Sequence, residues 1–197
     1  MEKEGVLYTS LPNGRAICNL CYRRCNIPEN GIGFCGVREN IKGKIYSTIY
    51  GKIIALNIDP IDVAKLARKH KLFNTFVTNG YMTPEAAELA SKYIDAMTVD
   101  FKGNASEAFA RKYISIVSES GIFDTLKVLK EKKVFIEITD LVVPKIGDSL
   151  EDAEKLVKWV YNNLGPETPI HFLRFHPDFK MTNIEETPIE TLEANII

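Results

Sequence analysis

All four cysteines of the chain lie in one short stretch, "CNLCYRRCNIPENGIGFC", which runs from Cys18 to Cys35. Their spacing is C-x2-C-x3-C-x9-C, and Pro28, Gly31 and Gly33 let the chain fold back before the last cysteine. The first residues contain no apolar signal segment, so we expect a cytoplasmic protein with reduced thiols. In that compartment clustered cysteines bind metal more often than they form disulfides.

The predicted metal ligands are the four thiolates of Cys18, Cys21, Cys25 and Cys35. Tetrahedral sulfur ligation suits zinc or an iron–sulfur cluster, and the spacing alone does not separate the two. The alternative is a set of four buried or redox-active thiols without metal.

The composition is that of an ordinary globular protein with one sizeable core. The chain has 197 residues, of which 45% are hydrophobic. Lys and Arg total 25 against 26 Asp and Glu, so the charge balance favours neither nucleic acid nor an anionic membrane as a partner. No apolar run approaches the length that spans a membrane.

Residues 1–60 are predicted to form a β-rich four-cysteine metal-binding module. Residues 6–17 are typical of a hairpin that turns at Asn13 and Gly14. Residues 44–58 are β-branched and aromatic, with Gly51 in the middle, and indicate two more strands.

Residues 61–197 are predicted to form a second domain in which strands and helices alternate. We expect strands at 74–80, 95–103, 134–144 and 170–177, and helices at 62–71, 83–94, 106–117, 122–133 and 148–165. Such alternation indicates βα units on a parallel sheet and therefore an α/β fold class. Since a full (β/α) barrel needs about 250 residues, this part is long enough for roughly half of a TIM-type barrel.

Polar residues gather where the predicted strands end. Asp100 and Lys102 are two apart and share a strand face, Thr78, Asn79 and Gly80 end another strand, and His176 ends the last one. The carboxyl ends of parallel strands are where α/β proteins place their sites. The alternatives are a simple Asp–Lys ion pair, a plain Asn–Gly turn and a structural histidine.

Four longer stretches resemble a known family: "TFVTNGYMTPE", "MTVDFKG", "FIEITDLVVPKIGDS" and "IHFLRFHPDFKM". They are similar to radical S-adenosylmethionine (SAM) enzymes, in particular to relatives of pyruvate formate-lyase activating enzyme and to the radical-SAM member of the AmmeMemoRadiSam system. The resemblance implies that Asp100, Lys102 and His176 contact SAM and that residues 78–80 line the SAM pocket.

The signature of that superfamily, C-x3-C-x2-C, is missing from this chain. In the family its three thiolates hold a [4Fe–4S] cluster with one iron open to SAM. Here the first three cysteines are spaced in the reverse order, and the expected break in the barrel falls between Ile61 and Asp62.

The resemblance therefore implies a radical-SAM iron–sulfur protein whose radical catalysis is lost or doubtful. Two alternatives stay open: an active enzyme that uses three of the cysteines, and a zinc-pinned scaffold or one half of a split enzyme. The exposed half-barrel is expected to self-associate or to bind a protein partner.

Overall fold

The structure, a computed structural model, describes residues 3–50 and 60–196, and the chain divides into two compact units. The first unit comprises Met1–Asn74 and Met82–Asp95, and the second comprises Thr75–Tyr81 and Ala96–Ile197. The domain boundary predicted at residue 60 falls beside residues 51–59, which lie outside the described residues, and it stays a prediction.

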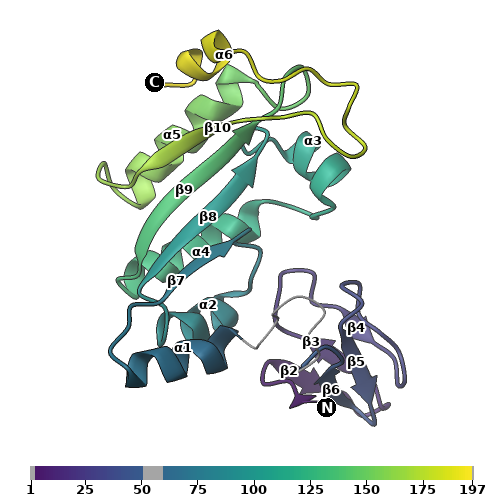
Figure 1. Cartoon of the computed structure of the whole chain (residues 1–197). Coiled ribbons are helices and arrows are strands. Elements are labelled where there is room, and N and C mark those ends of the chain that lie inside the picture. The colour runs from purple at the N-terminus through teal and green to yellow at the C-terminus, as the bar shows by residue number, and fades with distance from the viewer. Residues whose placement is uncertain (1–2, 51–59, 197) are drawn as a thin grey trace. The chain divides into compact units, whose positions relative to one another are not determined.

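Short antiparallel strands build the amino-terminal part of the first unit (Figure 1). One sheet joins β2 (Tyr8–Ser10), β3 (Ala16–Cys18) and β4 (Asn26–Ile27), and the other joins β1 (Lys3–Glu4), β6 (Lys44–Ser47) and β5 (Arg38–Ile41). The predicted hairpin over residues 6–17 is confirmed by the antiparallel pairing of β2 with β3. A small core of Ala16, Cys18, Ile27 and Ile45 holds the sheets together.

The hairpin of β5 and β6 was only partly foreseen. Residues 44–47 form the expected strand, but its partner β5 is polar in sequence and was not predicted. Lys42 and Gly43 join the two strands with positive φ angles of 50° and 78°, as a tight hairpin turn requires. The further strand predicted after Gly51 lies outside the described residues.

Two helices complete the first unit: α1 (Pro60–Lys69) and α2 (Pro84–Ser91). The predicted start of α2 is confirmed, since the Thr83 hydroxyl accepts a hydrogen bond from the Ala86 amide at 3.2 Å and Pro84 begins the helix.

A four-stranded parallel sheet forms the centre of the second unit. Its strands are β7 (Thr75–Thr78), β8 (Ala96–Lys102), β9 (Phe135–Val142) and β10 (Ile170–Arg174), and each pairs with the next one along the chain. This sequential order confirms the predicted parallel strands and is the order of a partial (β/α) barrel, not of a doubly wound sheet. The sheet does not close into a barrel in the described part of the chain.

The helices of the second unit are α3 (Glu107–Phe109), α4 (Ser120–Glu131), α5 (Leu150–Asn163) and α6 (Ile189–Ala194), with a π-helical turn at Ala110–Ile114. The Ser149 hydroxyl caps α5 by accepting from the Asp152 amide at 3.3 Å, as the sequence predicts. The short helix α6 was not predicted.

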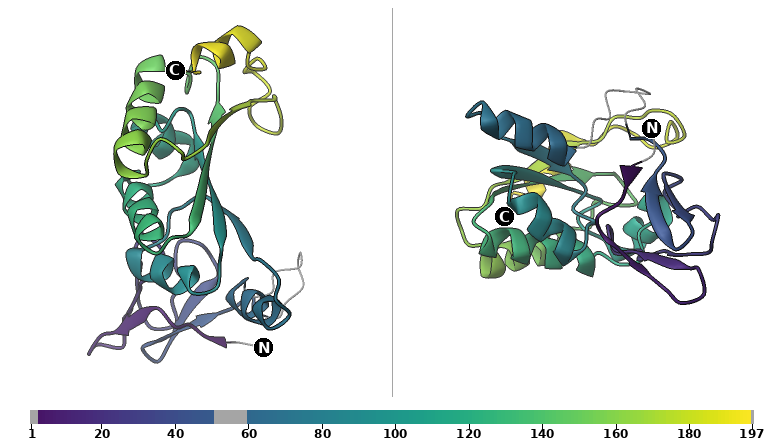
Figure 2. Two further views of the ribbon diagram at one scale, coloured as in Figure 1. Left: turned by 90° about the vertical axis from the view of Figure 1, so that its left-hand side faces the viewer. Right: turned by 90° about the horizontal axis from the view of Figure 1, so that it is seen from below.

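One face of the sheet packs against helices. Alternate residues of β8 (Met97, Val99 and Phe101) are buried, and α4 and α5 lie together on one side of the strands (Figure 2, left). The Phe101 ring contacts the Phe123 ring of α4 at 5.5 Å, and Phe123 contacts Trp159 of α5 at 4.4 Å. These aromatic contacts tie the sheet to both helices.

The other face of the sheet is exposed. The side chains of Val77, Phe135 and Leu173 are 74%, 56% and 41% exposed, and strand register places all three on the face opposite Val99. The apolar residues that close a barrel interior are therefore open to solvent here, as expected for part of a barrel.

A buried polar network lies at the carboxyl ends of β8 and β9. The Asn104 amide donates to Asp140 at 3.1 Å, and the Asn104 side chain donates to the Ser149 carbonyl and to Asn195 at 3.0 and 2.9 Å. Both Asn104 Oδ1 and Asp140 Oδ2 are buried, and neither has a hydrogen-bond partner among the described residues. Burial, with the nearby Asp100 charge, raises the pKa of Asp140 to about 7, although the Asn104 amide lowers it.

Gly80 ends β7 at a φ of +66°, where an added Cβ would lie 2.7 Å from Val99 Cγ1 and 2.9 Å from Ile122 Cγ2. We expect Gly80→Ala to lower the free energy of unfolding by about 2–4 kcal/mol, because it adds core overlap to backbone strain. Gly43→Ala is the control, because Gly43 has a φ of +78° and open space around it. It should cost only the strain of about 1 kcal/mol, as measured by urea unfolding. Equal losses would show that the core accommodates the methyl group.

The folded chain holds a proton on Asp140 that the unfolded chain releases near its ordinary pKa of 3.8. Its contribution to stability therefore falls as the pH rises from about 4 to about 7, and stays low above that range. We expect Asp140→Asn to become more stable relative to the wild type over this range, by on the order of 1 kcal/mol or more at pH 8. Unfolding at several pH values measures this, and the exposed Glu131→Gln should show no such trend. A constant difference would contradict the protonated carboxyl.

Candidate functional site

Three of the four cysteines lie on one hairpin of the first unit. Cys18 ends β3, and its amide donates to the Cys25 carbonyl at 3.0 Å, so the two residues are cross-strand neighbours at the base of the turn. Cys21 begins the turn itself, since its carbonyl accepts from the Arg24 amide at 3.0 Å. The spacing C-x2-C-x3-C thus becomes two cysteines at a hairpin base and one at its tip.

Cys35 lies on a second turn, between Gly33 and Gly36, whose carbonyl and amide are joined at 2.9 Å. The two turns meet, because the Arg23 guanidinium of the first stacks on the Phe34 ring of the second at 3.5 Å. The fold therefore brings the two cysteine-bearing turns side by side.

The thiols differ in their surroundings. Cys18 is buried in the small core, Cys21 and Cys25 are half-buried, and Cys35 is exposed. Burial raises the pKa of the Cys18 thiol; the Leu20 amide and Arg38 lower it, and the nearby Cys21 and Cys35 raise it further.

The described residues, which include all four cysteines, contain no group of three or more His, Cys, Asp or Glu side chains arranged to hold a metal ion. The convergence of the four sulfur atoms on one ion stays a prediction.

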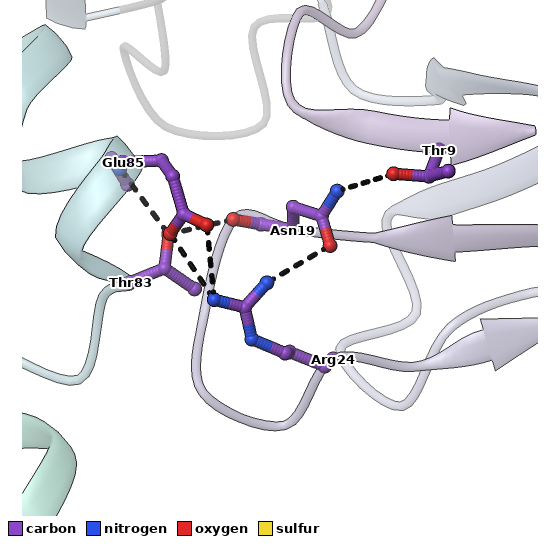
Figure 3. A network of polar contacts seen from close by, with 6 residues as sticks. Thr9, Asn19, Arg24, Thr83 and Glu85 are labelled. Atoms are coloured by element: carbon purple, nitrogen blue, oxygen red, sulfur yellow. Dashed lines mark hydrogen bonds and ion pairs between the residues drawn. The ribbon is translucent and has the colours of Figure 1, made fainter.

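A polar network fixes the tip of the first cysteine turn to the start of α2 (Figure 3). The Arg24 guanidinium donates to both carboxylate oxygens of Glu85, at 3.2 and 3.1 Å, and to Asn19 at 3.1 Å. The Thr83 hydroxyl donates to the Asn19 carbonyl at 2.7 Å while it caps the helix. One short segment therefore both carries three of the cysteines and anchors α2.

The predicted rim residues Asp100 and Lys102 lie together on the exposed face of the sheet. Lys102 Nζ donates to Asp100 Oδ2 at 2.6 Å, and the hydroxyl of Thr139 donates to Asp100 Oδ1 at 2.8 Å. Strand register continues this row through Thr139 to His171 on β10, a residue for which the sequence by itself indicates no role. Thr139 and His171 could be found only from register, because neighbouring strands are distant in sequence.

The turn of Thr78, Asn79 and Gly80 lies at the same end of the sheet, but its side chains serve the turn. Thr78 pairs with Val99 and so faces the buried side, and its hydroxyl accepts from the Gly80 amide at 3.2 Å. Asn79 accepts from the Tyr81 amide at 3.1 Å. Among the predicted SAM-binding residues, the structure thus joins Asp100 to Lys102 on the exposed face and Thr78 to Gly80 within their own turn.

His176 follows the end of β10 and is 81% exposed in its side chain. Its Nδ1 lies 4.0 Å from Glu186 Oε1, an oxygen that also lies 3.4 Å from Arg174. Within the described part of the chain, no hydrogen bond or ion pair joins His176 to Asp100 or Lys102, and the place of His176 in a SAM pocket stays a prediction.

None of the helices in the described residues has both the length and the apolar character needed to cross a membrane.

Comparison with solved structures supports the fold. The chain is similar to the crystal structure of a domain of pyruvate-formate lyase-activating enzyme from Bacteroides vulgatus, with a TM-score of 0.57 and 13% identity over 69% of this chain and 80% of that one. At this identity the similarity shows the fold alone. It agrees with the partial β/α architecture expected from the sequence.

Comparison by sequence identifies a relative. No protein-family model matches the chain. The Methanocaldococcus jannaschii protein "Uncharacterized protein MJ0808" is 30% identical over 270 aligned positions, which cover 97% of this chain and 80% of that protein. The alignment has 270 positions, but this chain has only 197 residues. At least 73 positions of the alignment (270 less 197) are therefore gaps in this chain. The extent and identity of the match show that the chain belongs to the same family as MJ0808.

Proposed function

We propose that the chain is an iron–sulfur or other metal-binding protein related to the radical-SAM activating enzymes, without radical catalysis of its own. The observation that carries the proposal is the meeting of the two cysteine-bearing turns in the first unit. The similarity of the fold to a pyruvate-formate lyase-activating enzyme domain supports the relationship.

The four cysteine sulfur atoms are suitable ligands for zinc or an iron–sulfur cluster. Cys18, Cys21, Cys25 and Cys35 supply four sulfur ligands, and their two turns already contact each other through Arg23 and Phe34. Four thiolates satisfy zinc or the four irons of a [4Fe–4S] cluster. Binding requires the side chains to draw together and the buried Cys18 to lose its proton.

The absence of catalysis follows from the ligand count. An iron–sulfur cluster with an iron open to SAM supplies the electron that radical-SAM chemistry needs. With all four thiolates as ligands, no such position is left, and the sequence carries no C-x3-C-x2-C triplet. If Cys35, the exposed cysteine on the separate turn, is not a ligand, the remaining three thiolates would leave one position open.

We also propose that the sheet rim keeps the ability to bind SAM. Asp100 and Lys102 present a carboxylate and an ammonium beside each other, which suits the amino and carboxylate groups of the methionine part of SAM. Residues 78–80 and His176 are the further proposed contacts, at the ends of their strands.

The first test of the proposal is anaerobic reconstitution of the full chain with iron and sulfide, and separately with zinc, followed by metal analysis and absorption spectroscopy. We expect one metal centre per chain, lost in Cys18→Ser and in Cys21→Ser. A chain that takes up neither metal would overturn the metal proposal. Zinc uptake without any cluster absorption would assign the site to zinc.

The same preparation then tests SAM binding and cleavage. We expect SAM to bind, with at least tenfold weaker binding in Asp100→Asn, and no 5′-deoxyadenosine to form under a strong reductant. Cleavage by the wild type that persists in Cys35→Ser would show three-cysteine ligation and an active enzyme.

Two observations favour a second candidate, in which this chain is one half of a split enzyme or a scaffold for a separate chain. The relative MJ0808 has at least 73 aligned positions that this chain lacks, and the sheet exposes Val77, Phe135 and Leu173. A segment supplied by another polypeptide could cover that face.

For the chain by itself we expect self-association, because a face with such exposed apolar residues and a free strand edge favours contact between copies. Size-exclusion chromatography with light scattering measures it, and Val77→Thr should shift the equilibrium toward the monomer. A stable wild-type monomer that binds no hydrophobic dye would contradict this expectation.

A further inference from the structure

A cavity of about 370 Å³ lies in the second unit, where α4 and α5 begin. Its lining includes three acidic residues (Glu107, Glu119 and Asp152), one lysine (Lys155) and two aromatic residues (Phe123 and Trp159). The volume is in the range of small-molecule sites in proteins. Neither the cysteine turns nor the sheet rim contributes to it.

Glu119 is the acidic residue of this lining whose carboxylate has no ion-pair partner in the part of the chain that the structure describes. Glu107 pairs with Arg111 at 2.6 Å, and Asp152 pairs with Lys155 at 3.3 Å. Glu119 is only 6% exposed, yet no hydrogen bond or ion pair reaches its carboxylate from any residue that the structure describes. An acceptor this deeply buried without a donor is costly, and in most proteins such a group is found with a partner.

The surroundings of Glu119 are strongly negative. Burial, together with the nearby carboxylates of Asp140, Asp152 and Glu107, raises the pKa of Glu119 to about 7. Lys155 does not offset this charge, because its ammonium group lies 2.8 Å from Glu151 and 3.3 Å from Asp152. A cation that entered the cavity would therefore relieve a repulsion that the protein leaves uncompensated.

The lining selects an organic cation over a metal ion. No group of three or more His, Cys, Asp or Glu side chains in the described ranges is arranged to hold a metal. Phe123 and Trp159, whose rings contact each other at 4.4 Å, instead supply aromatic surface to the cavity wall. Aromatic faces attract organic cations, and a carboxylate accepts hydrogen bonds from their N–H groups.

We propose that this cavity binds a small organic cation with N–H donors, an alkylammonium or a guanidinium group, through the Glu119 carboxylate and the aromatic wall of Phe123 and Trp159. The site is independent of the proposed metal and SAM sites, and it was not visible in the sequence. Its ligand would be an amine or guanidine compound, and not a divalent metal.

Trp159 gives a direct readout, because it is the single tryptophan of the chain and lines the cavity. Its fluorescence is followed during titration of the full chain with butylammonium or methylguanidinium at pH 8 and constant ionic strength. We expect a saturable change with at least one of these cations, and the stronger binder identifies the preferred group. Neutral n-butanol and tetramethylammonium, which lacks N–H donors, should bind at least about tenfold more weakly.

Glu119→Gln keeps the shape of the side chain and removes its charge, so it should weaken binding about tenfold or more. Glu131→Gln, an exposed carboxylate on the same helix, is the matched control and should bind as the wild type does. Equal affinity of Glu119→Gln and the wild type, equal binding of n-butanol or tetramethylammonium, or no saturable signal would each overturn the proposal.

The pH dependence of the wild type provides a second measurement if Glu119→Gln does not fold. Butylammonium stays charged from pH 6 to 8, so its affinity should rise across this range as Glu119 loses its proton. The other ionisable groups around the site include Glu107, Asp140, Asp152, Lys155 and Lys127, whose Nζ lies 5.9 Å from the centroid of the Trp159 ring. Of these, Asp140 also has a pKa of about 7. Asp140→Asn should keep the rise, and an affinity that does not change with pH would overturn the proposal.

Discussion

The second unit depends on packing that uses one face of its sheet. Met97, Val99 and Phe101 of β8 are buried at alternate positions. The Phe101 ring packs against Phe123 of α4, which in turn packs against Trp159 of α5. This burial removes apolar surface from water and stabilises the packing of the sheet. It also fixes which side chains of β8 face the opposite way, so the same alternation that builds the core delivers Asp100 and Lys102 to the exposed face.

The proposed metal and SAM sites draw on different parts of the fold. The cysteines depend on short antiparallel turns, whose positions are set by Asn19, Arg24 and Phe34. The rim depends on parallel register, which aligns Asp100 with Thr139 and His171. The first cysteine turn is held by contacts to the start of α2, whereas the rim is held by strand pairing, so the two sites can respond differently to the same substitution.

Sequence reasoning succeeded where the signal is local. The hydroxyl caps at Thr83 and Ser149 and the hairpin turn at Asn13–Gly14 depend on a few adjacent residues, and all three were predicted. Strand parity likewise placed Asp100 and Lys102 on one face.

The features that sequence reasoning missed are set by contacts between distant segments. The polar strand β5 exists because β6 pairs with it, and the row from Asp100 to His171 exists because three strands align. Glu119 shows no local signal of burial, since the packing of α4 and α5 encloses it. The absence of the C-x3-C-x2-C triplet is evident from the sequence alone, and the fold by itself would not reveal it.

The network that joins Arg24 and Asn19 to Glu85 and Thr83 bears on the order in which a metal site would assemble. In a zinc finger, the chain folds only when the ion binds, so part of the free energy of ion binding offsets the cost of ordering the chain. Here hydrogen bonds of the polypeptide hold the first cysteine turn in place before any ion arrives. Removal of the ion would then leave a folded apoprotein with its ligand turns in position, so loading and unloading could be reversible exchange steps of a folded protein.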